Sequence, residues 1–383
     1  AEIEEEDDGS SEFEAVINTN ITKQKSNGAS VNLTKIINEH QLTLGASLDS
    51  TEIDYGASET EDCELDAFRG VTNCESEPES TAAVSGSSFA FGLYASDTMK
   101  YTEKTFFTVA ARYNHSNVSN TITNFDDGVG SEQPKESFNY NSLNPSVGFS
   151  SNITNNLNFF GNISQSNRVP TVIELGCADK DNPCRLPTGL QADPYLEQVK
   201  AQTIETGIRV KLSKNTSIVS TVYRTQNKND ILFRALSNTG QGFFSNFDKT
   251  LREGLDFLAK SSYKNFVNSF NYSYLKATYQ SSGELFGGDR NIDIIPGTKI
   301  AGLPEHTVKL KSIWIPNEKL NIGGTLITTS SIVTQGNEDG KIGLDDDTYN
   351  VDTKIDGYSI LNLFLNYKPK KKLDYFIRIS NVF

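Results

Sequence analysis

Short and long connections alternate along this chain between segments in which polarity changes at every second residue. The alternation is clear over 204–212, 307–314, 361–367 and 373–380, where apolar residues share one face and polar residues the other. A period of two residues is typical of a β-strand with one apolar and one polar face. Helical periodicity is hard to find, so the pattern predicts an all-β fold.

The order of the connections restricts the fold further. A meander in which every second connection is short collects all short turns at one end of the strands and all long loops at the other. Outer-membrane barrels sort their connections in this way, with short periplasmic turns and long extracellular loops. We predict turns at Asn38–His40, Asp97–Lys104, Thr154–Asn156, Lys214–Asn215, Lys264–Asn265, Pro316–Lys319 and Lys370–Lys372. We predict long loops at 57–86, 119–138, 169–199, 229–247, 281–304 and 335–356.

Strand length and aromatic residues also favour an antiparallel up-and-down transmembrane β-barrel. We count about fifteen strands, most with ten or more extended residues, and crossing the hydrocarbon layer takes about 9–11 residues. Aromatic residues crowd beside the short turns, as expected of a girdle at one membrane interface. The alternative is the aromatic core of a soluble sheet. The aromatic residues are Tyr101, Phe106, Phe107, Phe159, Phe160, Tyr263, Phe266, Trp314, Tyr367, Tyr375 and Phe376.

Charge and hydropathy exclude several classes of protein. The 383 residues include 35 basic and 49 acidic side chains, a formal charge of -14, which argues against binding to nucleic acid. No run approaches the roughly 18 apolar residues of a membrane helix, which excludes a helical channel. The chain opens with an acidic stretch where a secretory leader would be basic and then apolar. We therefore expect a mature chain or a fragment.

The four cysteines form two local pairs, Cys63 with Cys74 and Cys177 with Cys184, each in a polar stretch. Neither pair has the spacing of a zinc site, and no histidine lies near them in sequence. We predict two loop-closing disulfides in an oxidising compartment. Free thiols of a cytosolic protein are the alternative.

No pattern of catalytic or metal-binding residues appears. His40, His115 and His306 are not spaced with Ser, Asp or Glu as in a triad or a metal site. We expect a protein that is not an enzyme and has no cofactor or metal, with His306 anchoring the barrel rim. Asp345–Asp347 with Asp352 offer oxygen ligands for calcium, but they lack the Gly and terminal Glu of an EF-hand loop. An ordinary acidic loop is the better interpretation.

One segment contains a recognisable motif. Residues 168–175 read R-V-P-T-V-I-E-L, and the strand that follows the second cysteine pair contains Glu205-Thr206-Gly207. Three weaker motifs follow in order: R-E-G-L-D from Arg252, L-P-E-H-T from Leu303, and I-S-N-V-F up to Phe383. The series resembles the barrel of TonB-dependent outer-membrane receptors, whose signature is R-x-P-T-x-x-E-L. The earlier half of the chain fits by architecture only.

The resemblance implies a barrel of about 22 strands closed by an N-terminal plug domain. Such a receptor binds a scarce ligand at its extracellular face, and an inner-membrane TonB complex then pulls on the plug. No plug sequence is recognisable here, and the family continues beyond N-V-F into another strand. We therefore expect residues 1–383 to be one partial barrel domain without the plug and the last strand. A terminal Phe as an outer-membrane insertion signal is the alternative.

The resemblance also implies structural roles for the residues that match the motifs, and no ligand contact is assigned to them. Pro170 is expected to end a strand, and Arg168 to pair with Glu174. The matching residues are Arg168, Pro170, Thr171, Glu174, Leu175, Glu205, Gly207, Gly254, Pro304, His306, Asn381 and Phe383. If the apolar alternates face lipid, Arg168, Arg209, Lys211, Lys309, Lys311 and Arg378 face the lumen. A solvated wall is their simplest role; contacts to a plug or to an anionic chelate are the alternatives.

Three functions stay open. The first is energised uptake of a scarce nutrient by a receptor in the outer membrane of a Gram-negative cell, with the ligand bound at long extracellular loops. Its partners would be outer-membrane lipid, the TonB complex through the plug, and a small molecule such as an iron–siderophore chelate, cobalamin or a carbohydrate. The second is a passive porin, and the third is a secreted all-β binding or adhesion protein. Apolar outward faces on nearly every strand would support a membrane barrel over a soluble sandwich.

Overall fold

The computed structural model describes residues 2–5, 11–65, 71–126, 128–176, 184–185, 196–235, 241–286, 290–342 and 349–382. Antiparallel strands form most of this part of the chain, as predicted, and one sheet contains 18 of them. The described residues include one short helix, α1 (Val172–Gly176). No helix among them is long and apolar enough to cross a membrane.

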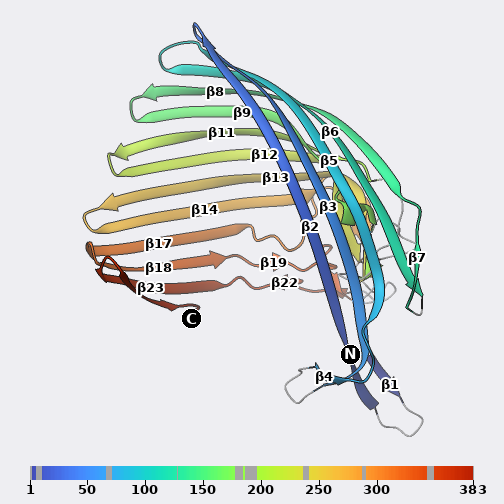
Figure 1. The fold of residues 1–383 in the computed structure, drawn as a ribbon. Coiled ribbons are helices and arrows are strands. Elements are labelled where there is room, and N and C mark those ends of the chain that lie inside the picture. The colour runs from blue at the N-terminus through green and yellow to red at the C-terminus, as the bar shows by residue number, and fades with distance from the viewer. Residues whose placement is uncertain are drawn as a thin grey trace.

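Fourteen main strands of this sheet pair in chain order, each with the next (Figure 1). The sequence predicted about fifteen. They are β2 (Ser11–Ile37), β3 (His40–Leu65), β5 (Glu79–Lys100), β6 (Thr105–Asp126), β8 (Glu136–Thr154), β9 (Leu157–Arg168), β11 (Val199–Ser213), β12 (Thr216–Ala235), β13 (Gln241–Tyr263), β14 (Phe266–Tyr279), β17 (His306–Asn317), β18 (Leu320–Thr329), β23 (Ser359–Lys370) and β24 (Leu373–Ile379).

Shorter strands add to the ends of this meander. Four of them pair only with the far ends of main strands: β1 (Glu2–Glu5), β4 (Val71–Cys74), β7 (Val129–Glu132) and β10 (Cys184–Arg185). Three further pairs lie within the connections: β15 (Gly283–Phe286) with β16 (Asn291–Ile294), β19 (Ile332–Val333) with β22 (Lys354–Ile355), and β20 (Lys341–Ile342) with β21 (Tyr349–Asn350).

The predicted sorting of connections is present. The seven predicted turns each join consecutive main strands, and all of them lie at one end of the sheet, the short-turn end. The turn expected at Asp97–Lys104 is shorter, because β5 continues to Lys100. The other connections lie at the opposite end, the long-loop end.

Three of the predicted loops are wrong in extent. Strands β3 and β5 run into 57–86, β6 and β8 into 119–138, and β12 and β13 into 229–247. These extensions are mostly polar, so hydropathy does not reveal them. Backbone hydrogen bonds to the neighbouring strand hold them extended whatever their side chains are.

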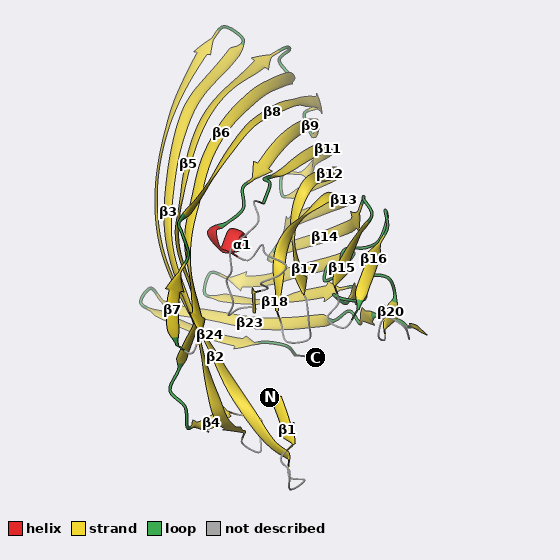
Figure 2. Ribbon diagram, turned by 90° about the vertical axis from the view of Figure 1, so that its right-hand side faces the viewer, coloured by secondary structure: helices red, strands yellow, loops and turns green. Residues whose placement is uncertain are grey.

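The sheet is strongly curved, and α1 lies on its concave face (Figure 2). Val172 of α1 lies where a Cβ on Gly86 would be, so Gly86 faces the concave side. Strand register then assigns every other residue to a face. Large apolar side chains are exposed in a band across the convex face: Val31, Leu33, Leu44, Leu93, Val109, Leu143, Val147, Ile163, Ile204, Ile208, Val222, Leu310 and Leu363.

Most of the aromatic residues expected in a girdle lie on the convex face near the short-turn end. Phe149 packs between Phe107 and Phe159, with ring centroids 6.5 and 5.3 Å apart, and Phe266 stacks on Trp314 at 6.4 Å. The assignment is wrong for three residues. Phe106, Phe160 and Phe376 lie on the concave face, because adjacent residues of a strand point to opposite faces.

Two motif glycines each lie beneath an aromatic ring from the neighbouring strand. A Cβ on Gly207 would lie 2.6 Å from Cζ of Phe160, and one on Gly254 would lie 2.5 Å from Cζ of Tyr223 and 2.5 Å from the Tyr274 carbonyl oxygen. Each glycine pairs directly with its aromatic across the strands. Glycine is therefore needed at both positions because a backbone must pass close under a ring.

The disulfide predicted between Cys63 and Cys74 is present and joins β3 to β4 at the long-loop end. The second predicted disulfide stays a prediction, because Cys177 lies outside the described residues and Cys184 is described only as part of the β10 backbone.

Replacing Gly254 by alanine should lower the free energy of unfolding by about 1–3 kcal/mol, because the added carbon forces the Tyr223 ring or the β14 backbone to move. Gly56→Ala is the matched control, since nothing lies within 4 Å of a Cβ at that position of β3. Urea titration of both variants in detergent measures the difference. Equal losses in the two variants would contradict the packing argument.

Candidate functional site

The motif R-V-P-T-V-I-E-L folds into a closed local structure at the end of β9. The N–H of Glu174 donates to Oγ1 of Thr171 at 3.1 Å, and the N–H of Thr171 donates back to Oε2 of Glu174 at 2.8 Å. This reciprocal pair is a capping box, which satisfies two backbone donors at the start of α1. Nη1 of Arg168 donates to both oxygens of Glu174 at 2.9 and 2.8 Å, so the pairing expected of these residues is present.

The apolar side of α1 packs into the concave face at its long-loop end. Val172 and Leu175 are each only 2% exposed and belong to a cluster with Val118, Ile122 and Tyr140 of β6 and β8. Pro170, just after β9, is also fully buried. The connection that follows β9 therefore begins by folding inward over the sheet, and α1 covers part of the concave face.

Strands β8 and β9 separate near α1, and beyond that point side chains form hydrogen bonds to backbone groups that strand pairing no longer reaches. Their pairing ends at Ser146 with Ser164. Beyond it, Nε2 of Gln165 donates to the carbonyl oxygen of Leu143 at 2.9 Å, and Nε2 of Gln198 donates to that of Asn141 at 2.6 Å. Side-chain amides thus satisfy strand carbonyls that no neighbouring strand reaches.

An amide-rich network continues from this gap across the concave face. Oδ1 of Asn167 accepts from Nδ2 of Asn114 at 2.9 Å and from Nδ2 of Asn144 at 2.8 Å. Arg112 donates to Oδ1 of Asn114 and to Oγ of Ser47, both at 2.7 Å. A hollow of about 200 Å³ opens beside these groups. Its polar lining can donate hydrogen bonds to an oxygen-rich ligand or to a peptide.

A buried carboxylate ties β12 to β13 nearer the long loops. Asp230 is 6% exposed, and its Oδ2 accepts from Oγ1 of Thr250 at 2.6 Å, Nη1 of Arg252 at 3.1 Å and Nδ2 of Asn227 at 3.2 Å. The charge of Arg252 and these hydrogen bonds compensate the burial of the acid. Arg252, which opens the R-E-G-L-D motif, thereby has a structural partner.

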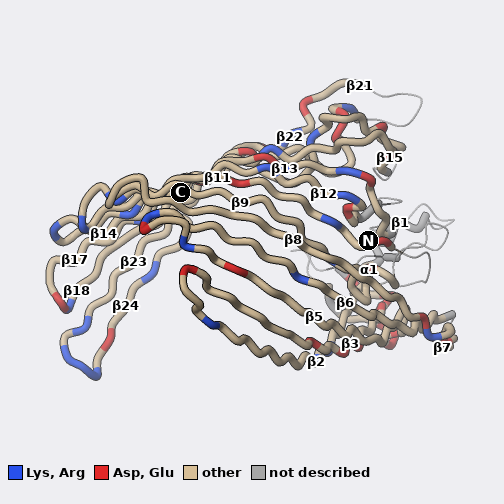
Figure 3. Tube along the Cα trace, turned by 90° about the horizontal axis from the view of Figure 1, so that it is seen from above, with Lys and Arg blue, Asp and Glu red and all other residues tan. Residues whose placement is uncertain are grey.

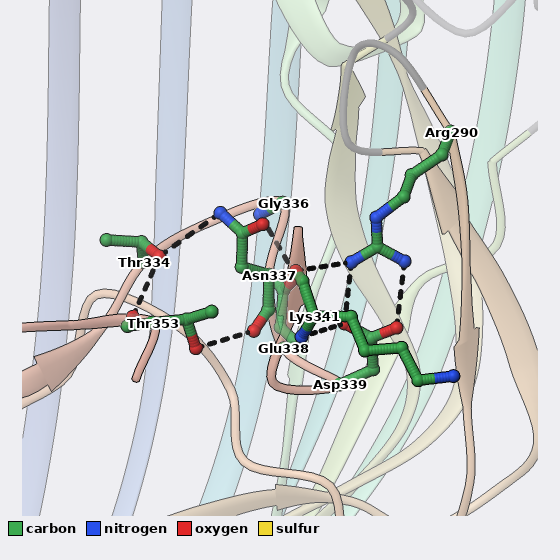
Figure 4. Close-up of polar contacts among 8 residues, drawn as sticks. All are labelled: Arg290, Thr334, Gly336, Asn337, Glu338, Asp339, Lys341 and Thr353. Carbon is green, nitrogen blue, oxygen red and sulfur yellow. Dashed lines mark hydrogen bonds and ion pairs between the residues drawn. The ribbon is translucent and has the colours of Figure 1, made fainter. Parts of the chain in front are cut away.

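Two long connections are clamped together by Arg290 (Figure 4). This arginine is 5% exposed and donates to both carboxylate oxygens of Asp339, at 2.8 and 2.6 Å, and to the carbonyl oxygen of Lys341 at 2.8 Å. Arg290 precedes β16 in the β14–β17 connection, whereas Asp339 precedes β20 in the β18–β23 connection. A buried, two-point arginine–carboxylate pair is a specific and strong contact.

The base of the β14–β17 connection has a small apolar core of its own. Leu285, Ile292 and Ile294 of the β15–β16 pair are buried against Phe247 and Tyr279. On the other side of the clamp, Oγ1 of Thr334 donates to the carbonyl oxygen of Thr353 at 2.8 Å, which closes the β18–β23 connection on itself. The two connections therefore form one interlocked wall at the long-loop end.

The pKa values of two acids in this wall, Glu338 and Asp339, are shifted in opposite directions. Burial raises the pKa of Glu338 above its ordinary 4.5, although the N–H groups of Glu338 and Gly336 partly offset this. Burial also acts to raise the pKa of Asp339, but the hydrogen bonds from Arg290 and from the N–H of Lys341 hold it below its ordinary 3.8. Burial therefore makes Glu338 easier to protonate than a free glutamate, whereas the contacts of Asp339 make it harder to protonate.

Most of the remaining motif residues lie at strand starts and ends, and Glu205 lies within β11. His306 opens β17, where its ring packs on Tyr272 and Tyr274 with centroids 6.1 and 5.3 Å apart, and its Nδ1 lies 2.9 Å from Oη of Tyr272. Pro304 precedes it, and Glu205 lies on the concave face opposite Tyr223. After β24, the N–H of Asn381 donates to Oδ1 of Asn362 at 3.0 Å. Phe383 lies outside the described residues.

The basic residues expected to face a lumen share the concave face by register. Arg209 lies over the ring of Phe160 at 3.8 Å, above Gly207, and Arg378 lies 5.3 Å from the ring of Phe376. The register of β11 and β17 places Lys211, Lys309 and Lys311 on the same concave face. Their contact with a lumen stays a prediction.

Among the described residues, no group of three or more His, Cys, Asp or Glu side chains is placed to hold a metal ion. Asp345–Asp347 lie outside those residues. Asp352 is described, and its nearest cation is Lys354 at 4.0 Å. His40 and His115 pair with Asp97 and Asn141 at 2.7 and 2.9 Å. The candidate site is a concave surface lined with polar side chains and bounded by a wall of loops.

The family described as "TonB dependent receptor-like, beta-barrel" matches residues 6–382. The chain belongs to this family. No curated protein matches the sequence. The resemblance stated from the R-x-P-T-x-x-E-L motif is confirmed, and the match also covers the earlier half of the chain.

Solved structures of such receptors share the fold at low sequence identity. The ferric yersiniabactin uptake receptor FyuA from Yersinia pestis superposes with a TM-score of 0.68 at 12% identity, over 96% of this chain and 50% of its own. The siderophore receptor PiuA from Acinetobacter baumannii superposes with a TM-score of 0.68 at 13% identity, over 95% of this chain and 52% of its own. The copper transporter OprC superposes with a TM-score of 0.65 at 12% identity, over 95% of this chain and 53% of its own. The chain spans about half the length of these proteins.

The family assignment settles two points. The chain is a TonB-dependent receptor barrel, and its family and structural neighbours are transport receptors and not enzymes, as the sequence predicted. At these identities the superpositions show the fold alone, so the ligand has to be argued from this chain.

Replacing Glu174 by alanine should release α1 from the concave face, because the variant loses the capping box and the contact with Arg168. Loss of such a cap costs about 1 kcal/mol, which corresponds to about fivefold faster exchange of the Leu175 amide hydrogen. That N–H donates to the Thr171 carbonyl oxygen at 3.1 Å. Glu174→Gln keeps an acceptor for Thr171 and should exchange more slowly than the alanine variant. Unchanged protection in E174A would show that α1 does not depend on its cap.

The stability of the loop wall should depend on pH through Glu338. Its folded-state pKa is raised, so its contribution is present below the ordinary value and is lost as pH rises through the raised value. The contribution of Asp339 is lost only at lower pH, as pH falls through its lowered pKa. Glu338→Gln should therefore unfold at a higher temperature than the unmodified chain once pH exceeds the raised pKa, with little difference in acid. Parallel pH profiles for the two chains would contradict this account.

Proposed function

We propose that this chain is the barrel region of an outer-membrane receptor that takes up a scarce nutrient with energy supplied by TonB. The observation that supports the membrane position most directly is the apolar band on the convex face. Leu33, Leu44 and Ile204 are 71%, 59% and 55% exposed, and exposed apolar side chains occur on the convex face of every main strand from β2 to β12 and again on β17 and β23. An exposed apolar surface of this extent needs lipid or a partner to cover it.

The direction of the barrel in the membrane is proposed from its two ends. The short-turn end has the aromatic girdle, which suits the periplasmic interface, and the long-loop end has the large polar connections, which suit the extracellular side. The Cys63–Cys74 disulfide at the long-loop end fits an oxidising exterior.

The ligand site proposed here is the concave face at the long-loop end, between α1 and the wall clamped by Arg290. The amides and the Arg112 guanidinium donate to oxygen atoms, which suits a metal chelate such as an iron–siderophore complex. FyuA is a ferric yersiniabactin uptake receptor and PiuA a siderophore receptor, whereas OprC is a copper transporter, so the choice among chelates rests on experiment. Residues 1–383 would form one partial domain, and a plug domain and the TonB complex would be the partners.

Uptake and location in cells test this proposal. In a strain whose own copy of the gene is deleted, restoring the gene should restore uptake of a radiolabelled ferric chelate. A protonophore should abolish that uptake, and the protein should fractionate with the outer membrane. Uptake that survives the protonophore would indicate a passive porin, and recovery in the soluble secreted fraction would indicate a binding or adhesion protein. Either result would overturn the proposal.

A further inference from the structure

The short turns are basic from β11 onward, although the chain as a whole is acidic. Figure 3 shows Lys and Arg at the turns beyond β14, β17 and β23. The segments around the turns after β11, β13, β17 and β23 contain seven lysines and two acids, in a chain whose formal charge is -14. They are residues 214–215, 264–265, 318–319 and 368–374. The turns after β2, β5 and β8 contain one lysine and two glutamates, so the positive charge is confined to one sector.

Backbone hydrogen bonds hold these four turns beside one another. Each of the first three is joined to the hairpin that follows it, by a bond of 2.7 or 2.8 Å. The N–H groups of Ser262, Ile315 and Lys368 donate to the carbonyl oxygens of Asn215, Asn265 and Lys319. Neighbouring turns are two strand spacings apart, about 10 Å. The lysines therefore form one arc along the edge of the sheet.

Most of this charge is not neutralised within the described part of the chain. Lys368 pairs with Asp374 at 2.9 Å. None of the other ion pairs there includes any of the six remaining lysines, and all six are exposed. We call these six residues the basic rim: Lys214, Lys264, Lys319, Lys370, Lys371 and Lys372.

The basic rim lies beside aromatic side chains of the convex face. Tyr263, Trp314, Tyr367 and Tyr375 share that face and are 42–67% exposed. Nζ of Lys264 lies 5.4 Å from the centre of the Tyr263 ring. Aromatic rings with lysine ammonium groups next to them are typical of the zone in which a membrane meets water. This position favours a ligand that is part of the membrane over an anion in solution.

We propose that the basic rim binds the phosphate groups of anionic phospholipids and gathers these lipids along the β11–β24 sector of the barrel. Each lysine close to a membrane surface strengthens attraction to anionic lipid by about fivefold. The turns after β2, β5 and β8 have no such excess of lysine, so the lipid beside them is not selected by charge. The inference rests on the proposed function for one premise, that lipid covers the convex face.

Trp314 reports on this sector, because it is the single tryptophan of the chain and lies on β17 between the turns of Lys264 and Lys319. The chain is reconstituted in vesicles of phosphatidylcholine and phosphatidylglycerol, with brominated acyl chains on one lipid or the other. Quenching of Trp314 then measures the relative affinity of the two lipids beside it. Phosphatidylglycerol should be preferred by about fivefold at low salt, and the preference should fall as salt screens the lysines.

Two double variants locate the preference on the basic rim. K264Q/K319Q removes the two turn lysines that flank β17 and should reduce the preference to about twofold or less. The matched control K260Q/K311Q removes the same charge from the concave face of the same region and should keep the preference of the unmodified chain. Circular dichroism confirms that both variants keep their strands.

Several results would overturn the inference. These are equal quenching by the two lipids in the unmodified chain, an unchanged preference in K264Q/K319Q, or the same loss in both variants. A preference that inorganic phosphate removes at constant ionic strength would assign the basic rim to soluble phosphate. If both brominated lipids quench Trp314 equally, only this inference fails; if neither quenches it, the convex face is not in lipid and the proposed function fails.

Discussion

Hydrogen bonding between neighbouring antiparallel strands is the constraint on which the rest of this structure depends. In a membrane no water satisfies a backbone N–H or C=O, and each unpaired group costs several kcal/mol. The fourteen main strands form a nearly continuous ladder, and its gap between β8 and β9 is closed by the amides of Gln165 and Gln198. Because the ladder fixes the register, it also fixes the two faces, with apolar residues on the convex side and amides and basic residues on the concave side.

The motif residues support this ladder and do not form a reactive centre. Gly207 and Gly254 let a ring from the neighbouring strand lie close to the backbone. Thr171, Glu174 and Arg168 turn the chain inward after β9, so that α1 covers the concave face. The loop wall uses the same principle, since Arg290 holds two connections whose described residues form no strand pairing with each other. Because the backbone is fixed at the long-loop end, the concave face has a defined shape there.

Most of the strands and turns could be predicted from the sequence, because the signals for them are local. Period-two polarity gave the strands over 204–212 and 361–367, and polar turn residues gave all seven turns. The limits of β3, β6 and β12 could not be predicted, because their polar ends are held by neighbouring strands and not by their own hydropathy. The pairing of Arg290 with Asp339, 49 residues apart, left no pattern in the sequence. Of the lysines on the concave face, Lys211 and Lys311 were expected there from the sequence, whereas Lys260 was assigned to it only through the strand register.

The central claim is that lipid covers the convex face, and the single tryptophan of the chain reports on it directly. Trp314 lies on that face, 42% exposed and stacked on Phe266 beside the short turns. In vesicles made with brominated phospholipids, its fluorescence should be quenched most by bromines placed near the headgroups, and iodide in the water should quench it weakly. Strong quenching by iodide, with none by any brominated lipid, would contradict the account.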